Sequence, residues 1–271
     1  MSDGSIAPAH LTVCVVVYKP DRQDLARTLA SLSSAIAHAV DLDVSVTIVD
    51  NSPAPDLSSW LNENFAQLRS TLIEGHGNIG FGRANNLVLP DTGDFHLVLN
   101  PDVVMASDAL GNAARFMQTH TNCLLLTPLA RSGDGTRHYL CKRFPSVLDL
   151  ALRGFAPRFI RDRFRSRLDR YEMRDVQKHG VYWNPPIVGG CFMFFRGHAV
   201  RKLGGFDDRY FLYFEDFDLS LRVGSEGDIA YAPDVTIVHG GGNASRKGIW
   251  HIYQFSKSAF SFYRRWGFKF F

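Results

Sequence analysis

Residues 11–99 alternate short apolar runs with segments of helical periodicity. Leu11–Tyr18 is a β-branched run suited to a strand buried on both faces, and Asp21–Ala37 repeats apolar residues at helical spacing. The alternation continues with expected strands at Val44–Val49, Thr71–Glu74 and Phe95–Leu99, and expected helices at Leu57–Phe65 and Arg83–Leu89. Because consecutive parallel strands need a helical crossover between them, this order predicts an α/β fold whose central sheet is mostly parallel, with helices on both faces.

The rest of the chain carries a second, less regular series of signals. Phe144–His179 is an Arg-rich insertion without strand character, and the residues from Ile249 onward are aromatic and basic at helical spacing. The other signals predict a helix over Leu110–Met117, strands over Leu124–Leu126 and Ile187–Phe195, a hairpin turn at Ser132–Gly135, a helix beginning near Glu215, and paired strand segments over Ile229–Val238. This half is expected to elaborate the same domain.

Bulk composition limits the class of protein. With 271 residues and 45% apolar content the chain can bury a large core, and no stretch approaches the roughly 18 apolar residues of a membrane span. Residues 1–10 lack the basic and apolar regions of a secretory signal. The four cysteines are too widely spaced for a CxxC metal site and are expected to be buried free thiols. These features predict a cytoplasmic protein.

Two segments of the chain are strongly basic. Nine basic and four acidic residues lie between Arg153 and Lys178, and six basic residues with no acidic one lie between Arg246 and Phe271, although the whole chain carries only +3. Basic segments on a mildly acidic body are typical of a protein that contacts an anionic partner, such as a phospholipid surface or a pyrophosphate-linked acceptor. Solvated helix faces would show the same composition.

Polar residues follow several of the expected strands. Tyr18, Asp50 and Asp102 each come at or just after the end of an apolar run, and the glycine-rich loop 75–82 follows another. Ligands of open α/β sheets bind at the carboxyl ends of the strands, so these positions predict one shared site. For each carboxylate taken alone, capping of a turn or a strand end is an adequate explanation.

The loop Gly75-His76-Gly77-Asn78-Ile79-Gly80 matches the GxGxxG pattern of dinucleotide-binding folds. It follows a strand and opens a helix, so a nicotinamide-dependent oxidoreductase is a second hypothesis. The loop comes after the third expected strand, however, whereas the dinucleotide fingerprint belongs to the first. The sequence contains no Walker A lysine motif, which excludes a P-loop ATPase.

Two separated acidic segments are the most specific signal in the sequence. Asn100-Pro101-Asp102 closes one apolar strand, and the runs 190–196 and 204–208 precede the acidic cluster Phe214-Glu215-Asp216-Phe217-Asp218. With residues 78–86 reading N-x-G-F-x-x-x-x-N, the chain resembles the inverting nucleotide-sugar glycosyltransferases of family 2, in their rhamnosyltransferase-like branch. The resemblance implies a GT-A fold in one domain, 1–271. Its nucleotide-binding half is expected at 1–105, and its acceptor and catalytic half at 106–245, which includes the basic insertion 144–179. A basic, aromatic C-terminal helix is expected at 246–271.

The resemblance also implies a divalent cation. Asp102 stands where the family's DxD-type motif has its last acid, with Asn100 at the first position, and His239 is expected to complete the metal shell. Hard oxygen ligands suit Mg²⁺ or Mn²⁺, and a Lewis acid stabilises the charge that develops on a nucleoside diphosphate leaving group. A histidine at a strand end is also common as a purely structural residue. The loop 240–242 is expected to close over the donor.

The same resemblance implies a set of donor-binding residues. Asp50 and Asn51 match the family's contact with base and ribose, and the loop glycines let backbone amides approach the nucleotide, with Arg83 near a phosphate. The complete expected set is Tyr18, Asp50, Asn51, Asn78, Gly80, Phe81, Arg83, Asn85, Asn100 and Gly190.

Glu215 and Asp216 resemble the family's ED motif, in which the aspartate is the general base. An inverting displacement needs a carboxylate that accepts the proton of the acceptor hydroxyl opposite the leaving group, and we assign that role to Asp216. Glu215 is expected to orient the acceptor. Acids in the first turn of a helix are also favourable with the helix dipole, which is the structural alternative.

The predicted activity is sugar transfer in bacterial cell-surface polysaccharide synthesis, with dTDP-L-rhamnose as the expected donor, a UDP-sugar as the alternative, and a glycan or polyprenyl-linked acceptor. The aromatic, basic tail has the composition of an interfacial segment, so peripheral contact with the inner face of the membrane is expected. The alternative is that the tail packs on the sheet and exposes only Gly267–Phe271. A nucleic-acid binder uses similar residues but leaves the acidic strand ends unexplained, so no nucleic-acid partner is predicted.

Overall fold

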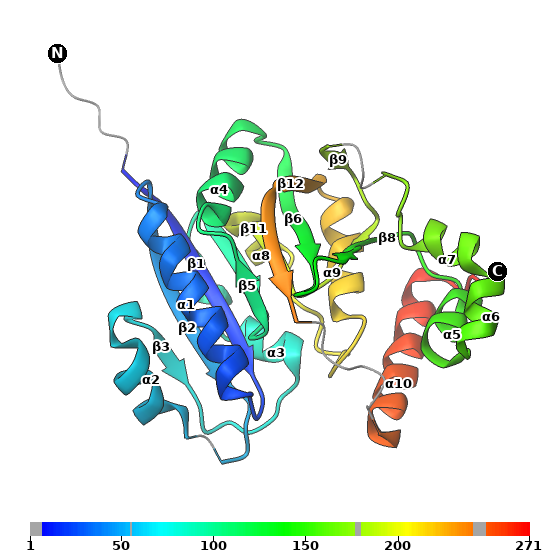
Figure 1. The fold of residues 1–271 in the computed structure, drawn as a ribbon, viewed down its shortest axis with the longest axis horizontal. Helices are drawn as coiled ribbons and strands as arrows, with labels where there is room; N and C mark the ends of the chain where they lie inside the picture. The colour runs from blue at the N-terminus through cyan, green and yellow to red at the C-terminus, as the bar shows by residue number, and fades with distance from the viewer. Residues whose placement is uncertain (1–6, 55, 177–179, 241–247) are drawn as a thin grey trace.

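A ten-stranded sheet forms the centre of the computed structural model, which describes residues 7–54, 56–176, 180–240 and 248–271 (Figure 1). The strand order is β3-β2-β1-β4-β11-β6-β12-β5, with β7 paired to β6 and β9 paired to β12. The strands are β1 (Ala9–Val17), β2 (Leu42–Asp50), β3 (Thr71–Ile73), β4 (Phe95–Leu99), β5 (Val103–Met105), β6 (Cys123–Arg131), β7 (Arg137–His138), β9 (Tyr182–Trp183), β11 (Phe192–Arg196) and β12 (Asp228–His239). A separate two-stranded sheet joins β8 (Cys141–Lys142) to β10 (Ile187–Val188).

Most strands along the main path of this sheet run in one direction. β3, β2, β1 and β4 pair in parallel, and so do β6 and β12. β11 is antiparallel to both β4 and β6, and β5 is antiparallel to β12. The prediction of a mostly parallel sheet is therefore confirmed, and the carboxyl ends of β1, β2, β4, β6 and β12 lie along one edge.

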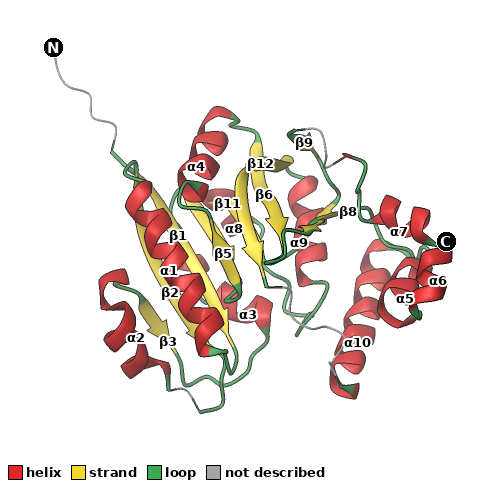
Figure 2. Cartoon of the chain, viewed as in Figure 1, coloured by secondary structure: helices red, strands yellow, loops and turns green. Residues whose placement is uncertain are grey.

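Helices cover both faces of the sheet, and the strands lie between them (Figure 2). The helices are α1 (Arg22–His38), α2 (Leu57–Phe65), α3 (Phe81–Asn86), α4 (Ala109–Thr119), α5 (Val147–Phe155), α6 (Arg158–Arg163), α7 (Arg165–Tyr171), α8 (Gly197–Lys202), α9 (Glu215–Gly224) and α10 (Ile249–Trp266), with short 3-10 turns η1 (Ala66–Leu68) and η2 (Leu89–Asp91). Helices α1 and α4 share one hydrophobic cluster with the sheet, whereas α3, α8 and α9 pack on its other face.

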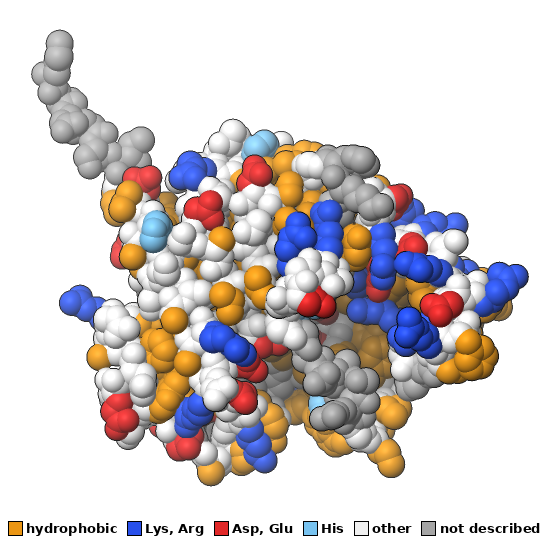
Figure 3. Space-filling model, in the orientation of Figure 1, with side chains coloured by type: hydrophobic (Ala, Val, Ile, Leu, Met, Phe, Trp, Pro, Cys, Tyr) orange, Lys and Arg blue, Asp and Glu red, His pale blue; other side chains and the backbone are white. Residues whose placement is uncertain are grey.

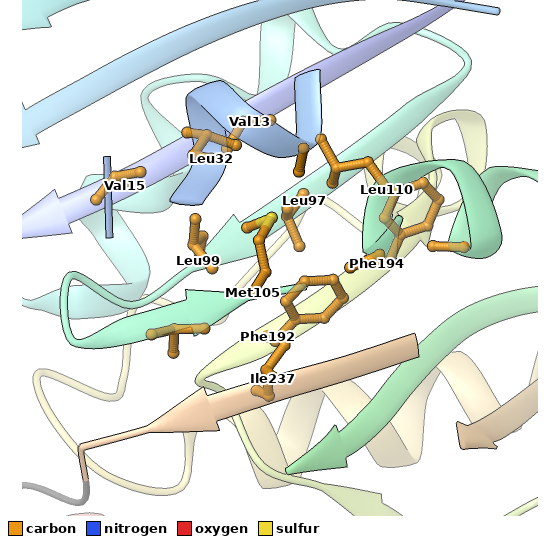
Figure 4. Packing of buried hydrophobic residues seen from close by; sticks show 14 of the residues in the cluster. Val13, Val15, Leu32, Leu97, Leu99, Met105, Leu110, Phe192, Phe194 and Ile237 are labelled. Atoms are coloured by element: carbon orange, nitrogen blue, oxygen red, sulfur yellow. The ribbon is translucent and has the colours of Figure 1, made fainter. Parts of the chain in front are cut away.

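Strand β1 shows why the centre of the sheet is apolar on both sides. Val13 and Val15 point into the cluster that contains Leu32 of α1, and Figure 4 shows these side chains converging with those of β4, β5 and β11. Cys14 and Val16 face the opposite cluster under α3. A strand alternates its side chains between faces, so β-branched residues at every position bury both of them. Each fully buried aliphatic side chain contributes about 1.5–3 kcal/mol relative to leaving it exposed.

Local hydrogen bonds position helix α1 over the sheet edge. Asp21 caps the helix, because its Oδ1 accepts from the backbone N–H groups of Gln23 (2.8 Å) and Asp24 (3.1 Å); a cap of this kind is typically worth about 1 kcal/mol. Farther along, the Thr28 hydroxyl donates to the carbonyl oxygen of Pro101 at 2.8 Å. The helix therefore holds the turn after β4 that carries the predicted metal-binding aspartate.

Two expected strands differ from the sequence prediction. The run 187–195 was expected as one strand but is two, β10 and β11, because the turn at 189–191 directs the Gly190 N–H to the Asp216 carboxylate and not to a strand partner. The paired strand segments expected over 229–238 form one strand, β12. Its register shifts between Ala232 and Thr236, beside Pro233, which has no N–H to donate.

The Arg-rich insertion folds as the three short helices α5, α6 and α7, and the tail folds as α10 beside them (Figure 1). Residues 177–179 of the insertion lie outside the described part of the chain. Phe262 and Tyr263 of α10 are buried in a cluster with Phe214 and with Leu150 of α5. The alternative that the tail packs on the sheet and exposes only its last residues is wrong, because α10 packs on α5 and on the segment before α9 and exposes Trp250 (48%) and other apolar side chains. No helix within the described ranges is long and apolar enough to cross a bilayer.

The four cysteines are buried and unpaired, as predicted. Burial raises the pKa of Cys123, Cys141 and Cys191 to about 12. Thiols with such pKa values are inert at neutral pH, so these residues belong to the core and not to a redox or metal site.

Candidate active site

A cavity of about 570 Å³ opens at the carboxyl edge of the sheet. Asn100 follows β4, Gly190 precedes the antiparallel β11, and His239 ends β12, so three strand ends meet there. Helix α9 adds Glu215 and Asp216, and α3 adds Phe81 from its first position. Figure 3 shows this side of the molecule hollowed between the part that contains the sheet and the part that contains α5, α6, α7 and α10. Folding thus brings six of the predicted residues to one cavity.

Asp216 is fixed in the cavity by two backbone donors. The Gly190 N–H donates to its Oδ2 at 2.9 Å, and the Phe217 N–H donates to its Oδ1 at 3.0 Å. A Cβ atom at position 190 would lie 3.2 Å from the Asp216 Cβ, so a glycine allows the backbone to come this close. The carboxylate is therefore held in one orientation with a free lone pair on each oxygen.

Burial changes the acidity of both acids at the start of α9. Loss of solvation raises the pKa of Asp216 to about 6, although the hydrogen bonds from Gly190 and Phe217 and the charge of Lys142 oppose the rise. Loss of solvation and the neighbouring Asp216 charge raise the pKa of Glu215 to about 8. Glu215 is 6% exposed, and its Oε2 has no hydrogen-bond partner in the described residues. Burial and the short separation of the two carboxyls both disfavour ionisation of the pair together, so these acids hold a proton at higher pH than solvated acids do.

The backbone just before these acids is strained. Tyr213 and Phe214 have φ angles of 71° and 66°, in the left-handed region that residues with side chains rarely occupy. Such conformations cost on the order of 1–3 kcal/mol each and persist only where packing enforces them. Here the Phe214 ring lies 5.1 Å from that of Phe255 and 5.2 Å from that of Phe262, and the Tyr213 hydroxyl lies 2.9 Å from Nδ1 of His251. Helix α10 thus holds the turn that presents the two acids.

Asp102 and His239 meet where β12 pairs with β5. Nε2 of His239 lies 3.3 Å from Oδ1 of Asp102, and the Gly240 N–H donates to the Asp102 carbonyl at 3.0 Å. Burial acts to raise the pKa of Asp102, but the polar contact with His239 and the side chain of Asn100 outweigh it and hold that pKa below its usual range. Asp102 is therefore ionised at neutral pH. Residues 241–247, including most of the loop expected to close over the donor, lie outside the described residues.

The residues at this point fit a divalent cation. The Asp102 Oδ1 is buried, has no well-aligned hydrogen-bond donor in the described chain, and stands beside an imidazole and the Asn100 amide. Within the described ranges no cluster of three or more His, Cys, Asp or Glu side chains could hold a metal by itself. Magnesium sites commonly use one or two carboxylates and leave the other positions to water and substrate phosphates. The donor set therefore suits a cation shared with a diphosphate, not a closed structural site.

The ends of β1 and β2 form a second polar region beside the cavity. Asp50 is 1% exposed; its Oδ1 accepts from the Ser52 N–H at 2.8 Å, and its Oδ2 has no partner among the described residues. Asn51 donates from Nδ2 to the Gly80 carbonyl at 3.2 Å and leaves its Oδ1 without a described partner. Tyr18, at the neighbouring strand end, is half exposed. Buried acceptors of this kind are costly unless a ligand donates to them.

The loop after β3 connects this region to the cavity. Gly80 has a φ of +93°, and a Cβ atom there would lie 2.5 Å from the Phe211 carbonyl oxygen, which also accepts from the Phe81 N–H at 3.1 Å. Asn78 accepts from the Gly80 N–H at 3.1 Å, and so shapes the turn. Because Gly80 contacts Asn51 while the next residue lines the cavity, the two regions are continuous.

Two predicted donor residues are engaged in holding the loop. The Asn85 amide donates to the Phe81 carbonyl at 3.0 Å, inside helix α3. The Arg83 guanidinium donates to the Asp208 carbonyl at 2.7 Å, and its side chain is 48% exposed. Asn86, the last residue of the motif at 78–86 but not one of the predicted donor-binding residues, exchanges two hydrogen bonds with the Phe206 backbone. Arg83 and Asn86 therefore connect α3 to the segment that leads to the acids, and Arg83, Asn85 and Asn86 are not among the residues that line the cavity.

Sequence reasoning missed one wall of the cavity. This wall, the cationic wall, lies on β7, β8 and the insertion and consists of Arg137, His138, Lys142, Arg153, Glu172 and Arg174. Arg153 and Arg174 both pair with Glu172, at 3.5 and 2.6 Å. The count of basic residues signalled the insertion but gave no sign that Arg137 and Lys142, which precede it, face the same space.

Comparison with known proteins agrees with this geometry. A model of the family "Glycosyl transferase family 2" matches residues 12–204. The chain is 28% identical over 242 residues to the N-acetylglucosaminyl-diphospho-decaprenol L-rhamnosyltransferase of Mycobacterium tuberculosis (strain H37Rv), covering 84% of this chain and 75% of that protein. It is 26% identical over 206 residues to the rhamnosyltransferase WbbL of Escherichia coli K12, covering 70% and 72%.

Solved glycosyltransferase structures share the fold. The mannosyltransferase PcManGT from Pyrobaculum calidifontis, in complex with GDP-Man and Mn²⁺, superposes with a TM-score of 0.58 at 18% identity and covers 92% of this chain. GalNAc-T7 with UDP, GalNAc and Mn²⁺ gives a TM-score of 0.61 at 15% identity and covers 87%. The chain spans 62% and 45% of those two chains.

The matched segment includes the strand ends, the glycine-rich loop, the Asn100-Pro101-Asp102 turn and the strand β11 that follows Gly190. The acids of α9 follow directly after it and face the same cavity. With the family model covering more than half of the 271 residues and with solved neighbours of the same architecture, the chain belongs to glycosyl transferase family 2 and has the GT-A fold.

Proposed function

We propose that the protein transfers an L-rhamnosyl group, with inversion at the anomeric carbon, from a nucleoside diphosphate donor to a hydroxyl of a lipid-linked glycan. The observation that carries the proposal is Asp216: a buried carboxylate, held by the Gly190 N–H, with a pKa raised to about 6, that faces a cavity also lined by His239, the partner of Asp102. The names of both relatives support the sugar, and the name of the Mycobacterium tuberculosis protein supports the acceptor class. We take dTDP-L-rhamnose as the donor and a UDP-sugar as the alternative.

Asp216 serves as the general base. As the acceptor oxygen attacks the anomeric carbon, its O–H proton passes to the Asp216 carboxylate, while the bond between that carbon and the donor's diphosphate oxygen breaks. The nucleoside diphosphate leaves with the electron pair of that bond. A base with a pKa near the working pH is efficient because it is ionised before the step and basic enough to take the proton. The Glu215 carboxyl, whose Oε2 has no hydrogen-bond partner among the described residues, forms a hydrogen bond that orients the acceptor.

The donor extends from the β1–β2 edge to the cavity. Asp50 and Asn51 each have a buried oxygen that would accept from the base or the ribose hydroxyls. The Gly80–Phe81 backbone leads from there to the diphosphate position beside Asn100. Asp102, His239 and Asn100 would hold a divalent cation, Mg²⁺ or Mn²⁺, which when bound neutralises charge on the departing diphosphate.

The exposed side of α10 and the tail after it would contact the membrane that carries the acceptor. Apolar side chains that are more than 45% exposed gather there: Ile249, Trp250, Ile252, Tyr253, Phe260, Phe268, Phe270 and Phe271. Helix α6 beside them carries Arg158, Arg161 and Arg163, all exposed. Aromatic rings at the headgroup level and cations against anionic lipid are the combination that interfacial segments use.

The first test is nucleotide binding followed by transfer. Calorimetry with dTDP, UDP, GDP and NAD⁺, each with Mn²⁺ and with chelator, should show cation-dependent binding of one nucleoside diphosphate. Transfer from the matching β-L-rhamnosyl donor should then give a product with the opposite anomeric configuration, read by NMR. Binding of NAD⁺ alone, or a product that retains the donor's configuration, would overturn the proposal.

A further inference from the structure

Ser220 lies in the second turn of helix α9 and is fully buried. Its hydroxyl donates to the Asp216 carbonyl oxygen at 2.7 Å and accepts from the Val188 N–H at 3.2 Å. The Val188 carbonyl oxygen also lies 3.4 Å away, but a hydroxyl has one proton, and the shorter distance assigns that proton to Asp216. One side chain therefore joins the first turn of the helix that carries the acids to strand β10.

The contact with Val188 distinguishes Ser220 from an ordinary helical serine. A serine that bonds the carbonyl four residues back is common in helices, and by itself this bond only satisfies the hydroxyl. Strand β10, however, pairs with β8 along one edge, and the N–H of the fully buried Val188 donates to Ser220 on the other side. Because a buried donor that loses its acceptor is costly, this bond fastens β10 to α9.

Strand β10 leads directly to the backbone that holds the Asp216 carboxylate. The Gly190 N–H, two residues after Val188, donates to the Asp216 Oδ2 at 2.9 Å. The two residues approach so closely that a Cβ atom at position 190 would lie 3.2 Å from the Asp216 Cβ. The hydrogen bonds thus form a closed ring: Val188 donates to Ser220, Ser220 donates to the Asp216 carbonyl, and the Asp216 side chain accepts from Gly190.

We propose that Ser220 is a positioning residue for the transfer reaction, because its hydroxyl fixes α9 against β10 and so keeps the Gly190 N–H on the Asp216 carboxylate. The inference rests on the proposed function, in which Asp216 is the base, and adds the residue that aims it. Ser220 is buried and is not among the residues that line the cavity, so it acts through Asp216. Without the hydroxyl, the first turn of α9 can shift relative to β10, and a misplaced carboxylate takes the acceptor's proton less efficiently.

The acidity of Asp216 gives a readout that a purely structural role would not change. The hydrogen bond from Gly190 lowers the pKa of Asp216 against the larger effect of burial, because a donor stabilises the ionised carboxylate. A weaker bond therefore raises this pKa. The other ionisable groups that interact with Asp216 stay in place in Ser220 variants; they include Lys142, Tyr171, Cys191 and Glu215.

The test compares Ser220→Ala with a matched variant in another helix. Ser31 of α1 forms the same two kinds of bond, since it donates to the Thr28 carbonyl at 2.8 Å and accepts from the Met105 N–H at 3.2 Å, but it joins α1 to β5. Both Ser220→Ala and Ser31→Ala should lower the midpoint of thermal unfolding by about 2–4 °C. In Ser220→Ala, kcat should fall roughly 10-fold with the donor KM unchanged. In Ser31→Ala, kcat should stay close to that of wild type.

Titration of the Asp216 carboxyl by carbon-13 NMR of labelled aspartate tests the inference without turnover, with Asp216→Asn to assign the resonance. The midpoint should lie about 0.5–1 pH unit higher in Ser220→Ala than in wild type and should not move in Ser31→Ala. Ser220→Thr keeps a hydroxyl that can bond the same carbonyl, so it should restore the wild-type midpoint. Ser220→Cys fills the space with a weak donor and should shift the midpoint in the same direction even if Ser220→Ala does not fold.

The results separate the inference from the proposed function. An unchanged midpoint in the Ser220→Ala and Ser220→Cys variants, or an equal shift in Ser31→Ala, would overturn the inference and leave Ser220 with a packing role. A raised midpoint with an unchanged kcat would support the placement of the carboxylate by Ser220 and would count instead against Asp216 as the base.

Discussion

The two sides of the active site are built in different ways. The donor side consists of the ends of β1, β2 and β4, parallel strands whose register runs without interruption from Ala9 to Val17 along β2. The acceptor side consists of short strands, three short helices of the insertion and the aromatic helix α10, joined by side-chain contacts. Under the proposed function, binding of the donor would depend on the regular sheet, whereas placement of the acids depends on contacts between segments far apart in the sequence.

The largest effect is expected from the residue where the two sides meet. Asp216→Asn removes the proton acceptor and leaves the shape of the side chain, so kcat should fall by roughly 10²- to 10⁴-fold, the usual contribution of a general base. Nucleotide affinity, measured by calorimetry, should stay within twofold of wild type because the donor residues are untouched. A variant that turns over at the normal rate would remove Asp216 as the base.

A donor-side change should affect binding first. Asp102→Ala removes the ionised carboxylate next to His239, so the Mn²⁺-dependent part of nucleoside diphosphate affinity should fall by roughly 10- to 100-fold. The measurement is calorimetry with Mn²⁺ and with chelator, for wild type and variant. If chelator makes no difference to the wild type, the cation site is not used.

The pH profile tests the acids as a unit. Asp216 must be ionised to accept a proton, and its pKa lies at about 6, raised above the usual value by burial. As the pH falls through 6 the carboxylate becomes protonated, so kcat/KM should drop about tenfold per pH unit below that point. Glu215→Gln removes the second titrating carboxyl of the pair, so the acidic side of the profile should then follow Asp216 alone. A fall of kcat/KM that begins only near pH 4 would mean that water reaches the Asp216 carboxylate in solution.

A smaller effect is expected from the contact between α10 and the turn before the acids. Tyr213→Phe removes the hydroxyl that meets Nδ1 of His251 at 2.9 Å and keeps the ring. Loss of one hydrogen bond should lower stability by about 1 kcal/mol and reduce kcat a few-fold, with nucleotide affinity unchanged. Thermal unfolding and steady-state kinetics measure the two effects. A fall in nucleotide affinity would show that α10 also shapes the donor side, which would break the comparison.

The smallest effect on catalysis is expected from the tail itself. Deletion of residues 267–271 removes Phe268, Phe270 and Phe271, all at least half exposed, along with Lys269. Association with vesicles of anionic phospholipid, measured by sedimentation, should decrease, while transfer to a water-soluble acceptor should change little. Sedimentation identical to that of the full chain would leave the tail with a packing role only, since backbone atoms of Lys269 and Phe270 also accept from the start of α5.

The same difference between the two sides explains how much the sequence could reveal. Strands β1 and β4 and helix α2 were predicted closely because their patterns are local, and β4 and α2 match residue for residue. The break between β10 and β11 depends on the hydrogen bond from the Gly190 N–H to the Asp216 carboxylate. No local sequence pattern indicates that bond. Arg137 lies in the predicted hairpin after β6, whereas Lys142 reaches the cavity through the pairing of β8 with β10, which sequence spacing does not display.

The same contrast between local patterns and long-range contacts applies to the site residues. Motif spacing pointed to Glu215 and Asp216, which line the cavity, and to Asp102, which lies beside His239. The strained turn at Tyr213 and Phe214 could not be predicted, because its cause is packing against a helix that begins at Ile249. Arg83 was expected near a phosphate and instead contacts the Asp208 backbone, a partner 125 residues away.

The support that α10 gives to the turn before the acids has a consequence for biosynthesis. Translation completes residues 7–240 before it reaches the helix that begins at Ile249, so the sheet and the nucleotide-binding edge can fold while the chain is still on the ribosome. The turn at Tyr213 and Phe214 gains its packing partners only when residues 251–262 emerge. A nascent chain would therefore acquire the ability to hold a sugar donor before it acquires the geometry to use it, and premature termination would yield a binding protein without catalytic power.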